Sequence, residues 1–178
     1  MQRQKASTDY TPCLNFASKN MYCTRVCRSS VASYFETLGK PRFISAPMVD
    51  QSDLAFRLLC KANGTDLAYT EMFHARNFAI DPRYRSDKID WYDKSNRNHI
   101  FDNNIVVQMA GNDKDVLLKA ASFIQHDPSV VGIDLNLGCP QNVAKKGKYG
   151  AYLLPDKNLV LGIVKHLSEN LDIPISVK

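Results

Sequence analysis

Residues 105–137 read IVVQMAGNDKDVLLKAASFIQHDPSVVGIDLNL: an apolar run, an amphipathic stretch and a second apolar run. The two apolar runs, 105–109 and 130–137, are rich in valine and isoleucine and predict buried strands. Between them a helix is expected to begin at Asn112 or Asp113, because apolar residues then recur at the spacing of one helix face: Val116, Leu117, Ala120, Ala121 and Ile124. A strand, a helix and a strand in this order predict parallel strands joined by a right-handed crossover.

The segment before this stretch repeats the alternation. Residues 43–49 predict a buried strand, and residues 67–72 predict another. Between them Ser52 is expected to cap a helix and Gly64 to end it. This helix is expected to turn one apolar face to the core, with Cys60 as a core thiol beside it: Leu54, Ala55, Leu58, Leu59 and Ala62.

The segment after it continues the pattern. A helix is predicted near residues 159–167 and a fifth strand at 173–177, whereas the polar residues 73–104 fit a long loop or a short helix plus a loop. Strands that alternate with helices indicate an α/β fold with a parallel sheet, either a barrel or a doubly wound sheet. The first predicted strand is not followed by G-x-G-x-x-G, which disfavours a dinucleotide-binding doubly wound sheet.

Composition narrows the class of protein. With 178 residues, 44% of them hydrophobic, the chain can bury one core, and its net charge of +5 suits a polyanionic partner as well as ordinary solubility. No apolar run is long enough to cross a membrane, so no membrane partner is expected. The five cysteines, an odd number without a secretory signal, argue against a disulfide framework. Cys23-x-x-x-Cys27 has no second pair to complete a metal site, so no metal is expected.

Polar residues gather where the predicted strands end. Asp134 and Asn136 alternate with apolar neighbours and therefore share one face of their strand, and Gln108 lies near the end of the previous strand. Such residues form either a structural hydrogen-bond network or a ligand site. Because β/α barrels place their active sites at the carboxyl ends of the strands, we favour a ligand site, to which Lys178 would also point.

A cysteine and a basic run follow the same strand. Gly138 permits close approach of a ligand and Pro140 stiffens the turn, so Cys139 is either a general acid or nucleophile at the mouth of a barrel, or an inert loop residue. No histidine stands next to it in sequence, which favours the role of acid. Lys145 and Lys146 lie in what is expected to be a basic, glycine-containing loop, suited to a phosphate backbone or simply to solvent.

Five motifs, taken together, resemble the tRNA-dihydrouridine synthases. They are APMVDQS at 46–52, LAYTEM at 67–72, VQ at 107–108, DLNLGCPQ at 134–141 and AKKGKYGA at 144–151. The order and spacing agree with that family from about residue 34 to residue 178, and the motif forms most resemble its eukaryotic branch that acts on D-loop uridines.

The resemblance implies a fold and a division of the chain. The family fold is a TIM-type (β/α)8 barrel that binds FMN, followed by a helical domain that holds tRNA. TIM barrels run to about 250 residues, so the five strands predicted here imply a barrel truncated after about five strands. Residues 34–178 are then a partial FMN-binding barrel, and residues 1–33 an N-terminal extension, expected to be disordered.

The resemblance also implies the residues of the cofactor site. Pro47, Met48 and Val49 would line the flavin at the end of the first strand. Gln108 would form a hydrogen bond with the isoalloxazine, and Lys178 matches a lysine that contacts the flavin. The implied cofactors are FMN and, as reductant, NADPH.

The implied substrate is a D-loop uridine of tRNA, which must leave its base stack to be reduced to dihydrouridine. Asn136 would hold the uracil, with Glu71 near it, and Lys145 and Lys146 would contact the RNA. Hydride would reach one carbon of the uracil double bond from reduced FMN, while Cys139, as general acid, would protonate the other.

Two further hypotheses remain open from the sequence. One is a non-catalytic, truncated isoform or fragment that binds RNA or a partner, since half of the cofactor site would be missing from a half-barrel. The other is a flavin barrel acting on a small molecule, such as a dihydroorotate dehydrogenase. We expect the protein in the cytoplasm or the nucleus, although the acid-poor start of the chain, with Arg3, Lys5 and Lys19, leaves a mitochondrial location open.

Overall fold

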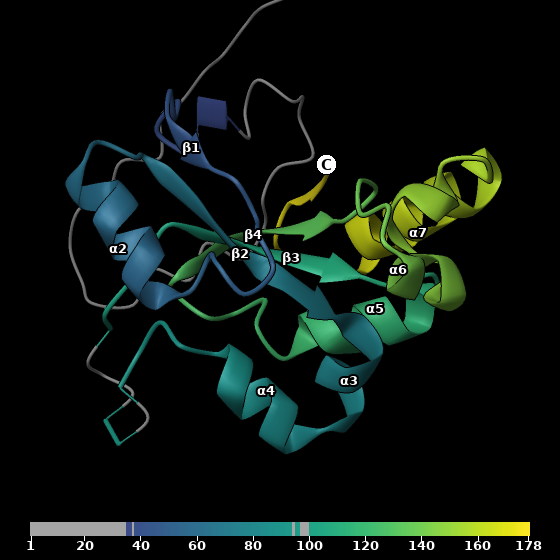
Figure 1. The fold of residues 1–178 in the computed structure, drawn as a ribbon, viewed down its shortest axis with the longest axis horizontal. Helices are drawn as coiled ribbons and strands as arrows, with labels where there is room; N and C mark the ends of the chain where they lie inside the picture. Colours follow the sequence, from purple (N-terminus) through teal and green to yellow (C-terminus); the bar gives the residue numbers. More distant parts are fainter. Residues whose placement is uncertain (1–34, 37, 94, 97–99) are drawn as a thin grey trace, which may run out of the picture.

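Five parallel strands form one curled sheet in the computed structural model, which describes residues 35–36, 38–93, 95–96 and 100–178 (Figure 1). The strands are β1 (Ile44–Ser45), β2 (Leu67–His74), β3 (Ile105–Ala110), β4 (Val130–Leu135) and β5 (Ile175–Val177). Their order in the sheet is their order in the chain, β1-β2-β3-β4-β5. In a doubly wound sheet the order of the strands reverses near the middle of the sheet, so the sequential order seen here indicates the β/α barrel. The predicted extension, residues 1–33, lies outside the described residues.

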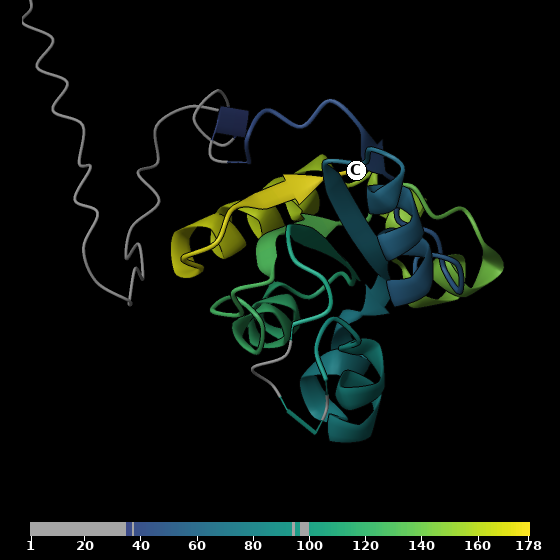
Figure 2. The same cartoon turned by 90° about the vertical axis from the view of Figure 1, so that its left-hand side faces the viewer.

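Helices cover one face of this sheet (Figures 1 and 2). They are α2 (Leu54–Ala62), α3 (Ala75–Ile80), α4 (Pro82–Lys88), α5 (Lys114–Ser122), α6 (Asn142–Gly147) and α7 (Lys157–Asn170). The main core lies between the sheet and α3, α5 and α7, where side chains such as Phe78, Leu117 and Ile163 are at most 1% exposed. No helix among the described residues is both long and apolar enough to span a membrane.

Strand β3 shows how the sheet separates the core from the site. Ile105, Val107 and Met109 pack into the main core, as the alternation of a strand requires. Gln108, between two of them, therefore lies on the opposite face of the sheet. Asp113 caps α5, since its Oδ1 accepts from the backbone N–H groups of residues 115 and 116. Of the two starts considered for this helix, Asp113 is the one observed.

The predicted first strand is much shorter than expected. Only Ile44–Ser45 pairs with β2, and the chain then turns, with Asp50 at a φ of 57°. Ser52 does not cap α2. The N-cap is Asp53, whose Oδ1 accepts from the backbone N–H of Phe56 at 2.9 Å. The oxygen of Ser52 does not cap the helix because it is bonded within the turn itself.

The orientation of α2 also differs from the prediction. Arg57 is its one buried residue, whereas Leu58 and Leu59 are 39% and 62% exposed and Cys60 is only half-buried, so it is not a core thiol. The amphipathic pattern located the helix correctly but not the face that this chain buries. Ion pairs of the arginine, described below, decide that orientation instead.

Two segments contain more helix than expected: residues 73–104, predicted as a long loop or a short helix plus a loop, and the basic run after Cys139, predicted as a loop. Residues 73–104 extend β2 to His74 and then form α3 and α4, the second of which Asp81 caps ahead of Pro82. The basic run is helix α6, whose C-cap Lys148 has a φ of 52°. Helices this short, of six or seven residues, have little intrinsic stability and form here through capping and packing, which local periodicity does not reveal.

Candidate active site

A chain of hydrogen bonds crosses the sheet from β3 to β5. Asp134, on β4, is fully buried; Nε2 of Gln108 donates to its Oδ2 at 2.7 Å, and Oγ of Ser176 donates to its Oδ1 at 2.7 Å. Both partners stand opposite Asp134 in the registers of the neighbouring strands. The register therefore gathers three polar side chains into one network, in which the buried carboxyl group is satisfied.

Asn136 connects this network to the cysteine. Its Nδ2 donates to Oε1 of Gln108 at 2.8 Å. Its Oδ1 accepts from the backbone N–H groups of Gly138 at 3.1 Å and of Cys139 at 3.0 Å. An asparagine oxygen that accepts from residues just ahead in the chain forms an Asx turn. The end of β4 therefore fixes the backbone of Cys139 directly.

A second turn holds Cys139 from the other side. Its carbonyl oxygen accepts from the backbone N–H of Ala151 at 3.1 Å, within the 3₁₀ turn η1 (Gly150–Leu153). Gly150 has a φ of +65°, and a Cβ added to it would lie 2.6 Å from that carbonyl oxygen. Only glycine combines this conformation with so close an approach.

Apolar side chains surround the half-buried thiol. Cys139 and Met72 pack against the buried residues Ala110, Ala144 and Tyr149. The Tyr149 ring meets His74 edge-on, with ring centroids 5.4 Å apart. Burial raises the pKa of Tyr149, and burial also lowers the pKa of His74, so both rings are uncharged near neutral pH. The thiol is thus positioned by backbone bonds and packed against uncharged groups, an arrangement that suits delivery of a proton.

The comparison with known protein families matches this region. The family described as "Dihydrouridine synthase (Dus)" matches residues 44–178, which include all five strands of the sheet. The chain belongs to the dihydrouridine synthase family. The predicted fold class, a TIM-type barrel represented here by five strands, is thereby confirmed together with the resemblance.

Individual dihydrouridine synthases are similar over most of this chain. A Saccharomyces cerevisiae protein named tRNA-dihydrouridine(16/17) synthase NAD(P)(+) is 43% identical over 144 residues, which cover 81% of this chain and 33% of that protein. A mouse protein, named as similar to the same synthase, is 41% identical over 142 residues, 80% of this chain and 28% of its own length. A human tRNA-dihydrouridine(20a/20b) synthase-like protein is 36% identical over 160 residues, 87% of this chain and 48% of its own length. The chain spans about a third of the length of the first of these relatives.

The residues that the family resemblance assigns to a flavin lie at or near the carboxyl ends of the strands, which form one end of the sheet. Pro47, Met48 and Val49 follow β1, and the last two are 38% and 47% exposed. Gln108 is buried, with both ends of its amide bonded within the chain. Lys178 follows β5, its backbone is bonded to the end of β4, and the residue is exposed. Their roles stay predictions.

These residues fit the group that the family resemblance implies. Exposed apolar side chains after β1, and buried polar groups on β3 and β4, suit a flat ring with polar edges, which is the chemistry of isoalloxazine. Ser45 adds an observation of its own. Its Oγ, at the end of β1, is buried without a hydrogen-bond partner. A buried hydroxyl left unpaired is costly, and a ligand at this end of the sheet could supply the missing partner.

The residues predicted to contact substrate divide into two groups. Glu71 is engaged within the chain: its Oε1 pairs with Nζ of Lys88 at 2.7 Å, and its Oε2 accepts from the backbone N–H of Asp50 at 3.3 Å. Lys145 and Lys146 are exposed on α6, directly after the cysteine turn. The structure therefore brings Glu71 to the loop after β1, and leaves the two lysines facing solvent beside the candidate site.

Sequence reasoning missed several residues of this site. Ser176 could have been found from the sequence, because it stands two residues before Lys178 on the last strand and therefore shares its face. Tyr149 and Gly150 are part of a motif, but their contact with Cys139 depends on how the chain folds back after α6. Arg57 gave no signal, since it stood on the predicted polar side of its helix.

The buried carboxyl group makes stability depend on pH. Burial raises the pKa of Asp134, against hydrogen bonds from Gln108 and Ser176 that lower it. A carboxyl with a raised folded-state pKa stabilises the fold fully below its unfolded-state pKa, about 3.9, and that contribution is lost as pH rises through the folded-state value. We therefore expect Asp134→Asn, which cannot ionise, to gain stability relative to the unmodified protein as pH rises from about 4 to about 8.

Denaturant unfolding at both pH values measures this difference. Asp66→Asn is the matched control, because backbone N–H groups of Phe43 and Arg42 lower the pKa of Asp66. The contribution of Asp66 is present above its unfolded-state pKa, about 3.9, and is lost only as pH falls below that value, so this variant should show nearly the same pH dependence as the unmodified protein between about 4 and about 8. Equal pH dependence in the Asp134→Asn variant and the unmodified protein would show that the buried group does not titrate as its surroundings require.

Proposed function

We propose that the protein to which these residues belong is an FMN-dependent tRNA-dihydrouridine synthase, which reduces D-loop uridines to dihydrouridine with NADPH. Membership of the dihydrouridine synthase family and the NAD(P)(+) in the names of similar proteins support the reaction class. The names of the relatives that refer to positions 16 and 17 support the choice of uridines. The observation that carries the proposal is the hydrogen-bonded network that ends on Cys139, at the end of the sheet that fits a flavin.

The residues of this chain would orient the base and supply its proton. The chemistry that FMN supplies when bound is hydride transfer to the uracil double bond, with electrons that come from NADPH. Cys139 holds a proton on Sγ for the other carbon of that bond. Asn136 keeps one N–H of Nδ2 beyond its bond to Gln108, and this N–H suits a uracil carbonyl. Pro47, Met48, Val49 and Lys178 would hold the cofactor.

Absorption and turnover test the proposal separately. The purified chain is first titrated with FMN, and quenching of flavin fluorescence together with a protein-bound visible band is the expected result. A longer protein, which contains these residues and matches the relatives in length, is then incubated with tRNA and NADPH. Loss of ultraviolet absorbance by the tRNA reports dihydrouridine. Flavin binding without loss of uridine would contradict the proposed substrate, and absence of both would contradict the activity.

The exposed lysines of α6 should contribute to the affinity for tRNA. Removal of one lysine that binds a phosphate is expected to reduce the slope of log affinity against log salt by about 1. We therefore expect Lys145→Ala combined with Lys146→Ala to weaken tRNA binding at low salt and to flatten its salt dependence. Binding measured across a range of salt concentrations gives both quantities.

Lys119→Ala is the matched control for that measurement. Lys119 lies in the last turn of α5, the helix that leads into β4, and therefore at the opposite end of the sheet from Cys139. The residue is exposed, and its replacement removes the same kind of charge. An equal effect of this control would assign the result to overall charge and not to α6.

A further inference from the structure

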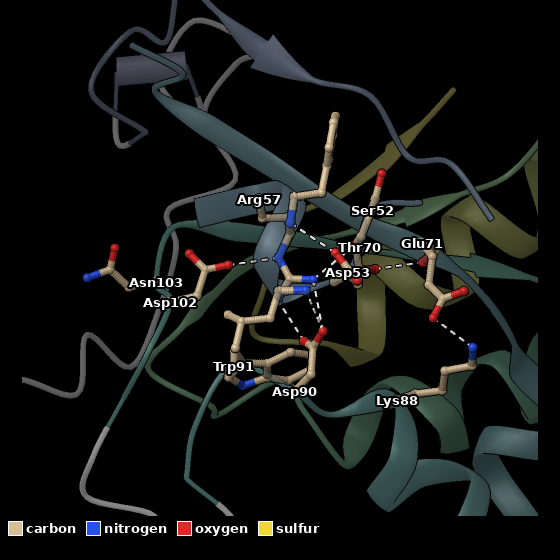
Figure 3. Close-up of polar contacts among 12 residues, drawn as sticks. Ser52, Asp53, Arg57, Thr70, Glu71, Lys88, Asp90, Trp91, Asp102 and Asn103 are labelled. Atoms are coloured by element: carbon tan, nitrogen blue, oxygen red, sulfur yellow. Dashed lines mark hydrogen bonds and ion pairs between the residues drawn. The ribbon is translucent and has the colours of Figure 1, made fainter. Parts of the chain in front are cut away.

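Arg57 is a buried cation with three bonded acceptors. It is 1% exposed; its Nε donates to Oδ2 of Asp102 at 2.8 Å, and its Nη2 to Oδ1 of Asp90 at 2.7 Å. Its Nη1 donates to the backbone carbonyl of Ser52 at 2.9 Å (Figure 3). Burial opposes the charge, but Asp90 and Asp102 more than offset it, so the pKa of Arg57 is raised. The guanidinium is thus a fixed junction between two carboxylates and one backbone carbonyl.

Ser52 carries this junction into the loop after β1. It is 1% exposed, and its Oγ donates to the carbonyl of Ala46 at 2.9 Å and accepts from the backbone N–H of Met48 at 3.0 Å. The backbone N–H of Ser52 donates to the carbonyl of Met48 at 3.0 Å. These bonds close residues 46–52 on themselves, so the position of Ser52 sets the shape of the whole loop.

A second interaction, between Asp50 and Glu71, also holds the loop after β1. Asp50, at a φ of 57°, donates its backbone N–H to Glu71. Glu71 in turn pairs with Lys88 of α4 (Figure 3). Lys88, Asp90 and Asp102 all belong to the connection between β2 and β3. That connection therefore acts on the loop at two points, at Ser52 through Arg57 and at Asp50 through Glu71 of β2, although the two regions are far apart in sequence.

Polar contacts must fix this loop because apolar packing does not. Met48 and Val49 are 38% and 47% exposed and lie outside the packed core clusters. Ordering a residue costs backbone entropy, so a loop without buried apolar side chains needs other bonds to remain in one shape. The bonds from Ser52 to Arg57 and from Asp50 to Glu71 supply them.

We propose that Arg57 is a positioning residue, which holds residues 46–52 in the conformation that binds the flavin by fixing Ser52 to the β2–β3 connection. This inference rests on the proposed function for the identity of the ligand, but the clamp itself is a property of the protein without ligand. Lysine cannot replace Arg57, because an ammonium group lacks the planar fork that reaches three acceptors at once.

Amide hydrogen exchange in the flavin-free protein tests the clamp. In Arg57→Lys we expect the amides of Met48 and Ser52 to exchange at least about tenfold faster, and FMN to bind about tenfold more weakly, since preorganisation is lost. Lys61→Met is the matched control. Lys61 is on the same helix and pairs with Asp102 and the carbonyl of Asn103, yet it makes no bond to Ser52. It should leave both quantities unchanged.

The outcomes separate the clamp from general stability and from the proposed function. Equal acceleration in Lys61→Met, or unchanged exchange in Arg57→Lys, overturns the proposal. If Arg57→Lys does not fold, Ser52→Ala decides, because it removes the two Oγ bonds to Ala46 and Met48 and spares the bonds that Arg57 makes. Unaltered exchange at Met48 would then overturn the role of Ser52 in carrying the clamp into the loop. Failure of the unmodified protein to bind FMN would overturn the flavin part alone, while the exchange rates still decide the clamp.

Discussion

Cys139→Ala is expected to reduce the rate of uridine reduction by about 10²–10⁴-fold, the usual contribution of a general acid. Alanine removes the proton donor and leaves the backbone bonds to Asn136 and Ala151, because both involve main-chain atoms of residue 139. The turn should therefore keep its shape, and the affinity for FMN should change by less than about twofold. Single-turnover measurements with reduced flavin isolate the step in which the proton is delivered.

Cys139→Ser is the control that separates position from proton donation. Serine preserves the shape of the side chain and donates a hydrogen bond, but its hydroxyl is a far weaker acid than a thiol. We therefore expect Cys139→Ser to reduce the rate of uridine reduction, although by less than Cys139→Ala does. Turnover at the unmodified rate in Cys139→Ala would remove the cysteine from the chemistry and leave it as a packed turn residue. The family assignment would stand, since it does not depend on that role.

Gly150→Ala is expected to impair the same site although it leaves the thiol group itself in the protein. A Cβ at residue 150 would lie 2.6 Å from the carbonyl oxygen of Cys139 and 3.0 Å from its Cβ, and the φ of +65° disfavours any other residue. Strain of this kind costs about 1–3 kcal/mol, and the cysteine must move to relieve the clash. We expect a lower free energy of unfolding together with at least about a tenfold loss of turnover, because displacement of a reacting group by about 1 Å can cost about a hundredfold.

Gly162→Ala provides the matched control for this substitution. Nothing lies within 4 Å of a Cβ at residue 162, which is in the middle of α7. There alanine should stabilise the helix by up to about 1 kcal/mol and leave turnover unchanged. Turnover of Gly150→Ala is compared at a temperature where all variants are folded. Full activity under those conditions would show that the turn after α6 does not position the cysteine.

Two turns meet at Cys139, and Gly150→Ala probes the second of them. Asn136 fixes the residue from the strand side through its Oδ1, and Gly150 fixes it from the side of η1 by close backbone contact. Because one turn belongs to β4 and the other follows α6, the position of the thiol depends on how β4 and α6 pack together. This also explains why the basic residues of α6 lie near the site, where a phosphate backbone would meet them.

The sequence by itself determined the alternation of strands and helices and the placement of polar residues at the strand ends. Both follow from local periodicity: residues two apart share a strand face, and apolar residues at helical spacing share a helix face. Gln108, Asp134 and Asn136 were therefore expected to share a site, and the structure joins them by hydrogen bonds. Cys139 was located by the glycine and proline on either side of it.

Only the tertiary structure decided which face of α2 is buried and what fixes the loop after β1. Arg57 meets Asp90 and Asp102 across 33 and 45 residues of sequence, and no local pattern encodes a bond over such a separation. The exposure of the leucines of α2 accords with those contacts, since burying one arginine with its carboxylates sets the rotation of the helix. Local sequence determines which elements form, whereas the partners of buried charges depend on the register and packing of the finished sheet.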